Sequence, residues 1–528
     1  MTKDVVIVGA GPNGLMLAAE LCLAGVRPIV LERLDSPDRA PKANGLVGQI
    51  VTTMDYRGLY QDLAAVASAP GGSRLTRTLF RLRAGHKPMP APRFTFGGFT
   101  LDLRRLEPNP LPLLPVSQWH LEQVLEKRAR SLGAEIRRGH RATGLRQDDD
   151  GVTVDVAGVD GSSQIRARYL VGCDGGHSTV RRLAGIGFAG VTSQDFVSRN
   201  GHVVLPRRML ARGQLRLAGG RRFAPFVFHR TERGAFSFAS LSPGVHVVSS
   251  YEWNQAVDEG VPMSVAELRD SVSRVVGQDI PISPPRQSGD YVLRRNTSRN
   301  TRLAEHYRLG RVLLAGDAAH VHFGLGGPGL NLGLSDVVNL GWKLAAEIAG
   351  RAPRGLLDTY HTERHPFAQR VNHQTQIQAI LLSPGTGTDA LRQDFSGYLA
   401  EEVNLRHVVQ TIAGTDLTYD MGDDVPAHPL LGRLAPDLVL TSAHARTRVA
   451  ELLRDAKPTL VDLTPDHALA HTEGPGDYVA ARCPGQPDLA AMLLRPDGYV
   501  AWAADCRTPS DVIHKGLGAA LRRWFVPA

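Results

Sequence analysis

Three glycines near the N-terminus stand where a polypeptide can bind the phosphates of a dinucleotide. They form the pattern Gly9-x-Gly11-x-x-Gly14, with Pro12 and Asn13 inside it, between an apolar run and a stretch of helix formers. In such a loop one glycine permits a tight turn, the next lets the backbone approach a pyrophosphate, and the third allows close helix–strand packing. The free N–H groups at the start of the helix favour bound phosphate. The chemistry indicated is the binding of a nucleotide cofactor.

An acidic residue supports the same interpretation. Glu32 ends a second short apolar run, eighteen positions after Gly14, a spacing at which a carboxylate can hydrogen-bond ribose hydroxyls. A carboxylate at this place suits an adenosine diol and disfavours a 2′-phosphate. The alternative is a glycine turn of purely structural use, which the flanking runs and the acid disfavour.

A second carboxylate follows an apolar run much later in the chain. Residues 311–315 lead into Gly316-Asp317, and Gly324, Gly327 and Gly329 then precede a long helical pattern. Asp317 is placed to accept a hydrogen bond from a ribityl hydroxyl, and the N-terminus of the following helix favours an anionic part of a ligand. The alternative is a glycine-rich turn with a capping aspartate.

A third motif, Asp174-Gly175, lies between these two. It ends the apolar run 170–173, and Arg181 and Arg182 follow at the start of a short helical pattern. Asp174 is a candidate cofactor contact, and its residue type fits a turn or a helix cap equally well.

The elements that must position these motifs form an α/β region. Residues 4–8, 15–24 and 27–31 predict a buried strand, a helix and a second strand. Further expected strands lie at residues 135–137, 151–156, 167–173 and 311–315, and further expected helices at residues 117–131, 329–348 and 355–382.

The rest of the chain predicts two other units. Residues 187–285 lack long helical periodicity and are rich in β-formers, which predicts a separate, mainly antiparallel sheet. Residues 384–435 are polar and rich in glycine and proline, so we expect this stretch to include a linker. Short strands and helices from residue 459 to the end predict a small α/β domain.

The composition of the chain limits the classes of protein and partner that fit these motifs. The 528 residues are 42% apolar and 21% charged, which excludes wholesale disorder and a coiled coil. The net charge of +9 is scattered, so we expect no nucleic-acid partner. The four cysteines form no CxxC pair, which leaves zinc and dithiol chemistry without support and favours a reducing compartment. We find no signal peptide and no apolar stretch of membrane-spanning length, so we expect a cytoplasmic protein without a membrane partner and without a metal.

The three motifs together resemble those of the single-component FAD-dependent aromatic hydroxylases. The glycine loop is similar to the family's FAD-pyrophosphate motif. Residues 169–181 resemble its Asp-Gly motif, and residues 310–320 its Gly-Asp motif at the flavin ribityl chain. The order and the spacing of all three agree. The segments 432–437 and 494–502 resemble the thioredoxin-like C-terminal domain of the phenol-hydroxylase branch.

The resemblance implies an α/β fold with a Rossmann-like FAD-binding domain, an inserted antiparallel substrate sheet and a thioredoxin-like C-terminal domain. Residues 1–74, 101–186 and 286–385 are assigned to the first domain. Residues 75–100 and 187–285 are assigned to the second, and residues 386–528 to the linker and the third. Because the last domain lacks CxxC, we expect packing or oligomer contacts from it, in a monomer or a homodimer.

The resemblance also implies further FAD contacts. Arg33 would meet the adenosine, Lys42 takes the place of a basic contact, Gln118 lies where the family contacts the phosphate–ribityl region, and Ala142 is a backbone contact to adenine. Surface ion pairs for the two basic residues and a helix-cap role for Gln118 are the alternatives. The full set of expected cofactor residues is Gly9, Gly11, Pro12, Asn13, Gly14, Glu32, Arg33, Lys42, Gln118, Ala142, Asp174, Gly316, Asp317, Gly324, Gly327, Gly329, Leu330 and Asn331.

The sequence departs from the family at four places near the expected flavin ring. Gly324, Pro328 and Leu332 replace a proline, a glutamine and a threonine, and Gln49 stands where many members carry an arginine. FAD binding should survive, because these contacts are mostly backbone, but the polar surroundings of the ring differ.

The resemblance implies an NADPH- or NADH-consuming monooxygenase that inserts one atom of O2 into a polycyclic aromatic substrate of polyketide type, through a flavin C4a-hydroperoxide. Baeyer–Villiger oxygenation, and an oxidase or dehydrogenase without oxygen transfer, are the alternatives. The sequence does not indicate which side chain is catalytic. His202, His229 and His246 are candidates by residue type alone.

Overall fold

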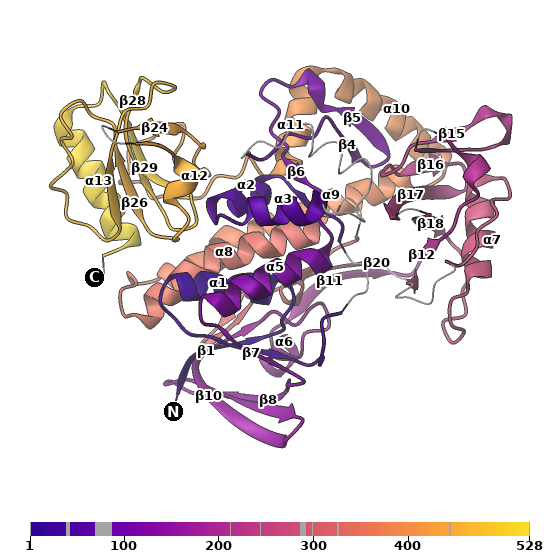
Figure 1. Cartoon of the computed structure of the whole chain (residues 1–528), viewed down its shortest axis with the longest axis horizontal. Helices are drawn as coiled ribbons and strands as arrows, with labels where there is room; N and C mark the ends of the chain where they lie inside the picture. Colours follow the sequence, from indigo (N-terminus) through magenta and orange to yellow (C-terminus); the bar gives the residue numbers. More distant parts are fainter. Residues whose placement is uncertain are drawn as a thin grey trace.

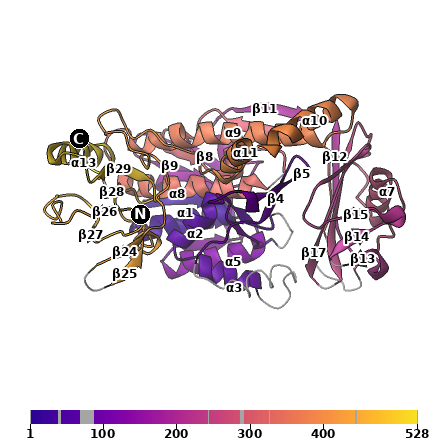
Figure 2. The same ribbon diagram turned by 90° about the horizontal axis from the view of Figure 1, so that it is seen from above.

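A computed structural model describes residues 2–38, 43–68, 87–211, 213–242, 244–285, 292–297, 299–324, 327–442 and 445–526. A central α/β region separates a five-stranded sheet from a C-terminal α/β unit, and these two lie at opposite ends of the molecule (Figures 1 and 2).

The central sheet has the strand order β21-β22-β10-β1-β2-β7, and β8 and β9 extend it through β10. Strands β22, β10, β1, β2 and β7 run parallel, and their apolar residues are buried, as parallel strands require. The strands are β1 (Lys3–Val8), β2 (Ile29–Glu32), β7 (Glu135–Arg138), β8 (Arg141–Gln147), β9 (Val152–Gly158), β10 (Gly161–Gly172), β21 (Arg308–Leu309) and β22 (Val312–Leu314).

Helices stack on one face of this sheet, where α1 packs between α5 and α8 (Figure 1). The helix expected from residue 117 begins with Ser117 as its cap, which accepts a hydrogen bond from His120 N. The helices of the region are α1 (Pro12–Leu23), α2 (Gln49–Tyr56), α3 (Tyr60–Ser68), α5 (Gln118–Ser131), α6 (Thr179–Leu183), α8 (Pro328–Ile348) and α9 (Thr359–Leu382).

The register of the parallel strands brings the three motifs together. Val8 is paired with Gly172 and with Leu31, and Gly172 with Leu314. The residues that follow each strand therefore leave the sheet at one edge, because parallel strands share their carboxyl ends.

The second sheet is antiparallel, with the order β16-β17-β18-β12-β19. Its strands are β12 (Phe196–Val203), β16 (His229–Thr231), β17 (Gly234–Ser242), β18 (Val245–Trp253) and β19 (Leu293–Asn296). A three-stranded sheet, β11 (Phe188–Ser193), β20 (Arg299–Ala304) and β23 (His320–Val321), joins it to the central region, and β13 (Leu210–Ala211), β14 (Gln214–Arg216) and β15 (Arg222–Phe223) form a small outer sheet.

This part of the chain also contains a helix that the sequence pattern does not predict. Helix α7 (Val265–Val276) packs its buried apolar residues on one face of the five-stranded sheet. Its signals were local: Ser264 caps the N-terminus by accepting from Glu267 N, and Gly277 closes the helix in the left-handed conformation.

The stretch 384–435, which we expected to include a linker, also carries two helices that the sequence pattern does not predict, α10 (Thr386–Ala400) and α11 (Glu402–Ala413). Together with the hairpin β4 (Arg93–Phe96) and β5 (Phe99–Asp102), they form a separate apolar cluster. Polar, exposed faces hid their helical pattern. The short strands β3 (Leu46–Val47) and β6 (Leu113–Leu114) pair with each other as a separate two-stranded antiparallel sheet.

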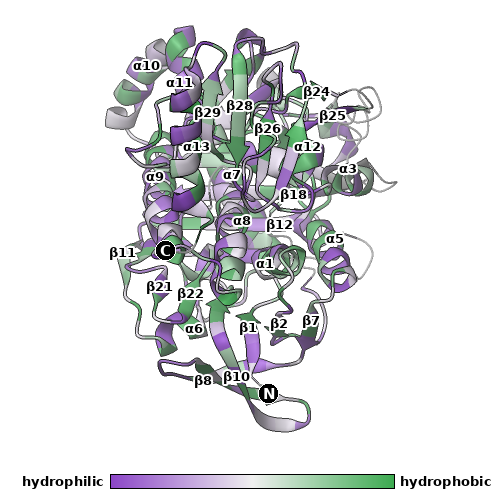
Figure 3. Ribbon diagram, turned by 90° about the vertical axis from the view of Figure 1, so that its left-hand side faces the viewer, coloured by the Kyte–Doolittle hydropathy of each residue, from purple (hydrophilic) through white to green (hydrophobic). Residues whose placement is uncertain are grey.

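The C-terminal unit has a four-stranded sheet in the order β27-β26-β28-β29, with only the β26–β27 pair parallel. Strands such as β28 are almost wholly apolar (Figure 3), and α13 covers the sheet. Its elements are β24 (Val439–Thr441), β25 (Arg446–Arg448), α12 (Val449–Leu452), β26 (Thr459–Asp462), β27 (Asp477–Ala480), β28 (Leu489–Leu494), β29 (Val500–Asp505) and α13 (Ser510–Trp524). In the described part of the chain, no helix combines the length and the apolar character needed to cross a membrane.

Candidate active site

The first glycine loop has the geometry of a phosphate cradle. A Cβ added to Gly14 would lie 1.9 Å from Gly9 O, and one added to Gly9 would lie 2.4 Å from Cys173 O. These two glycines are therefore required by packing within the protein. Gly11, which precedes α1 as its N-cap, has no atom within 4 Å of such a Cβ. Protein atoms therefore fill the space beside Gly9 and Gly14, whereas the space beside Gly11 is open to a ligand. Pro12 occupies the first position of the helix.

Glu32 is fixed beside this loop. Its Oε2 accepts from Ala10 N at 2.8 Å and its Oε1 from Leu34 N at 2.9 Å. Each carboxylate oxygen keeps a further lone pair for a diol. His140 N donates to Glu32 O at 2.8 Å, so the start of β8, with buried Ala142, lies at the same end of β2.

Asn13 joins the first loop to the Gly-Asp motif. A Cβ at Gly316 would lie 1.8 Å from Asn13 Nδ2, and one at Gly333 of α8 would lie 2.4 Å from the same atom. Gly316 also has a φ of +61°, which an L side chain rarely adopts. The Asn13 side chain fills the space that the two glycines leave, a role that the glycine-loop motif does not predict.

Asp317 is an exposed carboxylate among buried neighbours. A Cβ added to Gly329 would lie 2.7 Å from His322 Nε2 and 3.9 Å from Asp317 Oδ1, so both side chains lie close to Gly329. Burial lowers the pKa of His322, although the Asp317 carboxylate acts in the opposite direction. The turn therefore places an exposed carboxylate near a half-buried, neutral imidazole.

The N-terminus of α8 begins at the glycine-rich segment, as expected. Gly327 is its N-cap with a φ of +66°, and neither Gly327 nor Gly324 has an atom within 4 Å of an added Cβ. Asn331 ties this turn to β3: its Oδ1 accepts from Val47 N and its Nδ2 donates to Gly327 O. Leu330 packs partly buried against the central core. Asn331 thus holds the helix end, and its contact with FAD stays a prediction.

Asp174 acts as a helix cap. Its Oδ1 accepts from Ser178 Oγ at 2.5 Å, and its Oδ2 accepts from the backbone N–H groups of Thr179 and Val180. Arg181 then crosses to the Gly-Asp motif, where its Nη1 donates to Ala318 O at 2.8 Å. The structure brings this motif to the site edge, and a direct cofactor contact by Asp174 stays a prediction.

The remaining expected contacts are less defined. Arg33 is exposed. Gln118 begins α5, its Nε2 donates to Glu122 Oε1 at 2.8 Å, and its backbone N–H donates to Ala43 O. Lys42 lies outside the described residues. For these three the FAD contacts stay predictions.

An aromatic surface faces the site from the five-stranded sheet. Phe323, which follows His322, meets Phe196 edge-on at 4.5 Å between ring centroids, and Phe196 in turn contacts Trp253 at 5.2 Å. Tyr251 lies on the same face, with its hydroxyl bonded by Ser249 and Ser237, and burial raises its pKa. This face is opposite the one that α7 covers.

A buried polar network beneath the Gly-Asp turn was missed by the sequence analysis. The carboxylate of Asp336 on α8 accepts from Gly316 N at 3.3 Å, from His320 Nε2 at 2.6 Å and from Arg364 Nε at 2.9 Å. All three side chains are 0% exposed. Burial would raise the pKa of Asp336, but the charges of His320 and Arg364 outweigh it, so the carboxylate stays ionised.

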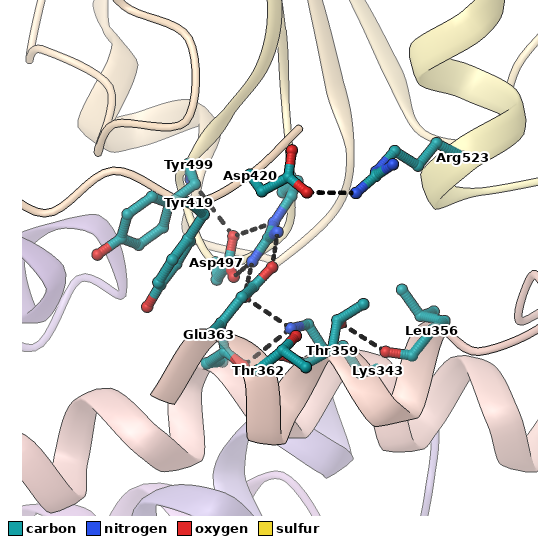
Figure 4. Close-up of polar contacts among 12 residues, drawn as sticks. Lys343, Leu356, Thr359, Thr362, Glu363, Tyr419, Asp420, Asp497, Tyr499 and Arg523 are labelled. Carbon is teal, nitrogen blue, oxygen red and sulfur yellow. Dashed lines mark hydrogen bonds and ion pairs between the residues drawn. The ribbon is translucent and has the colours of Figure 1, made fainter. Parts of the chain in front are cut away.

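A second buried network joins α8 and α9 to the C-terminal unit (Figure 4). Glu363 accepts from Lys343 Nζ at 2.7 Å and from both Nη atoms of Arg495, at 2.6 and 2.9 Å. Arg495 also donates to Asp497, which accepts from Trp342 Nε1 at 3.2 Å. Two cations and two anions are thus paired inside the molecule.

This network predicts a pH dependence of stability. Burial alone would raise the pKa of Glu363, but Arg495 and Lys343 lower it to about 2, below its ordinary 4.5. The resulting stabilisation is complete above pH 4.5 and is lost as the pH falls towards 2. We expect the difference in unfolding free energy between the wild type and Glu363→Gln to shrink by about 2 kcal/mol between about pH 5 and pH 3. Urea titrations at each pH measure it, and a constant difference would contradict the paired charges.

The site is that of a flavoprotein: a nucleotide cradle, a carboxylate turn and a helix N-terminus converge on an aromatic sheet face. Comparisons with known proteins agree. Residues 2–375 match the FAD binding domain family, and residues 428–528 match the aromatic-ring hydroxylase C-terminal family. The chain belongs to the FAD-dependent aromatic-ring hydroxylases and is an FAD-dependent monooxygenase.

Relatives match over nearly their whole length. The 12-dehydrotetracycline 5-monooxygenase/anhydrotetracycline 6-monooxygenase of Streptomyces rimosus is 39% identical, over 100% of this chain and 99% of its own. The rifampicin monooxygenase of Streptomyces venezuelae is 38% identical, over 95% and 96%. The solved anhydrotetracycline hydroxylase of Streptomyces rimosus superimposes with a TM-score of 0.82 at 37% identity, over 99% of both chains. The resemblance seen in the sequence is thereby confirmed, with FAD as the cofactor and NAD(P)H as the family's typical co-substrate.

Proposed function

We propose that the protein hydroxylates a polycyclic aromatic substrate of polyketide type, using NADPH or NADH and O2. The observation that carries this proposal is the contact between Phe323 and Phe196. It places the aromatic face of the five-stranded sheet against the loop that follows Asp317, so a flat substrate lying on that face would border the flavin site. The two monooxygenase relatives, named for anhydrotetracycline and rifampicin, support a large polycyclic substrate.

The residues present fit FAD. The open space at Gly11 and at the N-terminus of α1 suits the pyrophosphate, and Glu32 suits the adenosine ribose. The exposed carboxylate of Asp317 would accept from a ribityl hydroxyl, and the first turn of α8 at Gly327 would face the ring. When bound, FAD supplies the electron transfer and the oxygen activation.

The protein's own residues then bind and orient the substrate. Trp253 and Phe323, which pack against the fully buried Phe196, offer aromatic edges and faces to a fused ring system. Tyr251 adds a hydroxyl group. Burial raises the pKa of Tyr251, so this hydroxyl stays protonated and can donate to a substrate carbonyl. The closed aromatic face also excludes water from the reacting region.

The reaction is tested with purified protein, NAD(P)H, a panel of polycyclic phenols and ¹⁸O2. We expect coenzyme consumption that depends on substrate, and a product that gains one ¹⁸O atom as a phenol. An ester product would contradict hydroxylation and indicate Baeyer–Villiger oxygenation. Substrate oxidation with hydrogen peroxide release and no ¹⁸O in the product would reject the monooxygenase and support an oxidase.

The flavin contact is tested separately by Asp317→Ala. Because the exposed carboxylate is available to a ribityl hydroxyl, its loss should weaken FAD binding by about tenfold, without lowering the thermal midpoint of the apoprotein. Titration of the apoprotein with FAD measures the effect. Asp358→Ala, which removes an exposed carboxylate paired with Arg308, is the control and should bind FAD normally. Unchanged binding by Asp317→Ala would reject the Gly-Asp assignment.

A further inference from the structure

The carboxylate of Asp336 accepts hydrogen bonds from three parts of the chain, one of which is the Gly316–Asp317 turn that we expect to contact the flavin. It binds the turn itself through Gly316 N, β23 through His320, and α9 through Arg364. A buried carboxylate with three donors has few alternative arrangements, since losing any one donor leaves a charge unsatisfied. The position of Gly316, and with it that of exposed Asp317, therefore depends on Asp336.

Arg364 extends this junction away from the turn. It is 0% exposed, and while its Nε binds Asp336, its Nη1 donates to Tyr419 Oη at 2.9 Å. Its Nη2 lies 3.4 Å from Leu332 O, in the first turns of α8. A planar guanidinium fixes the relative directions of all these bonds, so a shift of Tyr419 would be passed to Asp336.

Tyr419 in turn belongs to the C-terminal part of the chain, by which we mean the segment that follows α11 together with the C-terminal unit against which it packs. Its backbone N–H donates to Gly432 O at 2.8 Å, and its ring lies 4.3 Å from that of Tyr499. Tyr499 donates to Gln49 Oε1 at 3.3 Å. A cavity of about 60 Å³ at this place is lined by residues that include Gln49, Asn331, Arg364 and Tyr499. The C-terminal part thus borders the first turn of α8, and Figure 4 shows Tyr419 and Tyr499 side by side above α9.

We propose that Asp336 is a positioning residue for the Gly316–Asp317 turn, and that Tyr419, acting through Arg364, makes the C-terminal part of the chain a functional component of the FAD site. This inference rests on the proposed function, because it takes that turn as an FAD contact. The C-terminal unit, which has no CxxC pair, would then support cofactor binding and not dithiol redox chemistry.

The test compares two variants that each remove one buried hydroxyl between the central region and the C-terminal part. Tyr419→Phe keeps the ring contact with Tyr499 but loses the bond to Arg364. Tyr56→Phe, the control, loses the bond to Ala435 O, which involves neither Arg364 nor Asp336, and Tyr56 packs in a different apolar cluster from Tyr419. FAD titration of each apoprotein gives its affinity, and the visible spectrum of each holoprotein reports the flavin surroundings.

We expect Tyr419→Phe to weaken FAD binding about fivefold to tenfold and to shift the flavin spectrum, while Tyr56→Phe changes neither, even if both lower the thermal midpoint. Asp336→Asn should weaken binding at least as much as Tyr419→Phe. If Asp336→Asn fails to fold, the comparison of Tyr419→Phe with Tyr56→Phe still tests the inference. Equal effects of the two tyrosine variants on FAD, or no effect of Tyr419→Phe, would overturn the inference. Normal FAD binding by Asp317→Ala would instead reject the flavin assignment on which it rests.

Discussion

Gly11→Ala is expected to reduce the affinity for FAD about 100-fold or more, since a single methyl group would occupy the space in which the pyrophosphate approaches the backbone. Gly11 has no protein atom within 4 Å of the added Cβ and no positive φ. The apoprotein should therefore fold normally, and its thermal midpoint should be unchanged. Titration of the apoprotein with FAD and a thermal melt without FAD measure the two quantities.

Two other glycines provide the controls for this experiment. Gly387 on α10 also has open space around it, and Gly387→Ala should leave FAD binding unchanged. Gly14→Ala places the methyl group 1.9 Å from Gly9 O, so it should lower apoprotein stability and FAD affinity together. Normal FAD binding by Gly11→Ala would mean that the first loop does not hold the pyrophosphate.

Arg495→Ala is expected to lower the unfolding free energy of the C-terminal unit by about 3–5 kcal/mol, because it leaves the buried carboxylates of Glu363 and Asp497 without their main partner. Arg495 is 0% exposed and lies 4.4 Å from the ring of Trp524 and 5.2 Å from that of Trp342. Urea unfolding followed by tryptophan fluorescence therefore reports on this place directly.

The matched control is Arg523→Ala, which breaks the ion pair with Asp420 in the same part of the molecule. Both partners are exposed, with side chains 40% and 82% accessible, so the expected change is at most about 0.5 kcal/mol. Similar midpoints for Arg495→Ala and the wild type would show that the buried pairs do not stabilise the junction.

Much of the nucleotide site could be predicted from the sequence because its signals are local. The types and spacing of Gly9, Gly11 and Gly14 predict a tight loop before a helix. A carboxylate at the end of an apolar run, such as Glu32 or Asp317, is well placed to accept a hydrogen bond from a ribose or ribityl hydroxyl. The parallel register then brings separate motifs to one edge. The assignment of each residue to FAD remains a prediction, since packing explains Gly14 and capping explains Asp174 without a ligand.

The buried networks could not be predicted, because their partners are far apart in the chain. Asp336 and Arg364 are 28 positions apart, and Glu363 and Arg495 are 132 apart. From composition alone each of these residues suggests a solvated surface charge. The aromatic face of the second sheet was equally hidden: a strand pattern shows that Phe196 and Trp253 alternate with other residues, but not which strands become neighbours.

The buried pair of Glu363 and Arg495 limits how this chain can be recombined with its relatives. A crossover near residue 428, where the match to the hydroxylase C-terminal family begins, would take Glu363 from one parent and Arg495 from the other. A chimaera would then fold well only if both parents supply compatible charges and shapes at this junction. For directed evolution by segment exchange, α8, α9 and the C-terminal strands therefore form one inherited block, and loops of the aromatic sheet at the far end are the better places to exchange.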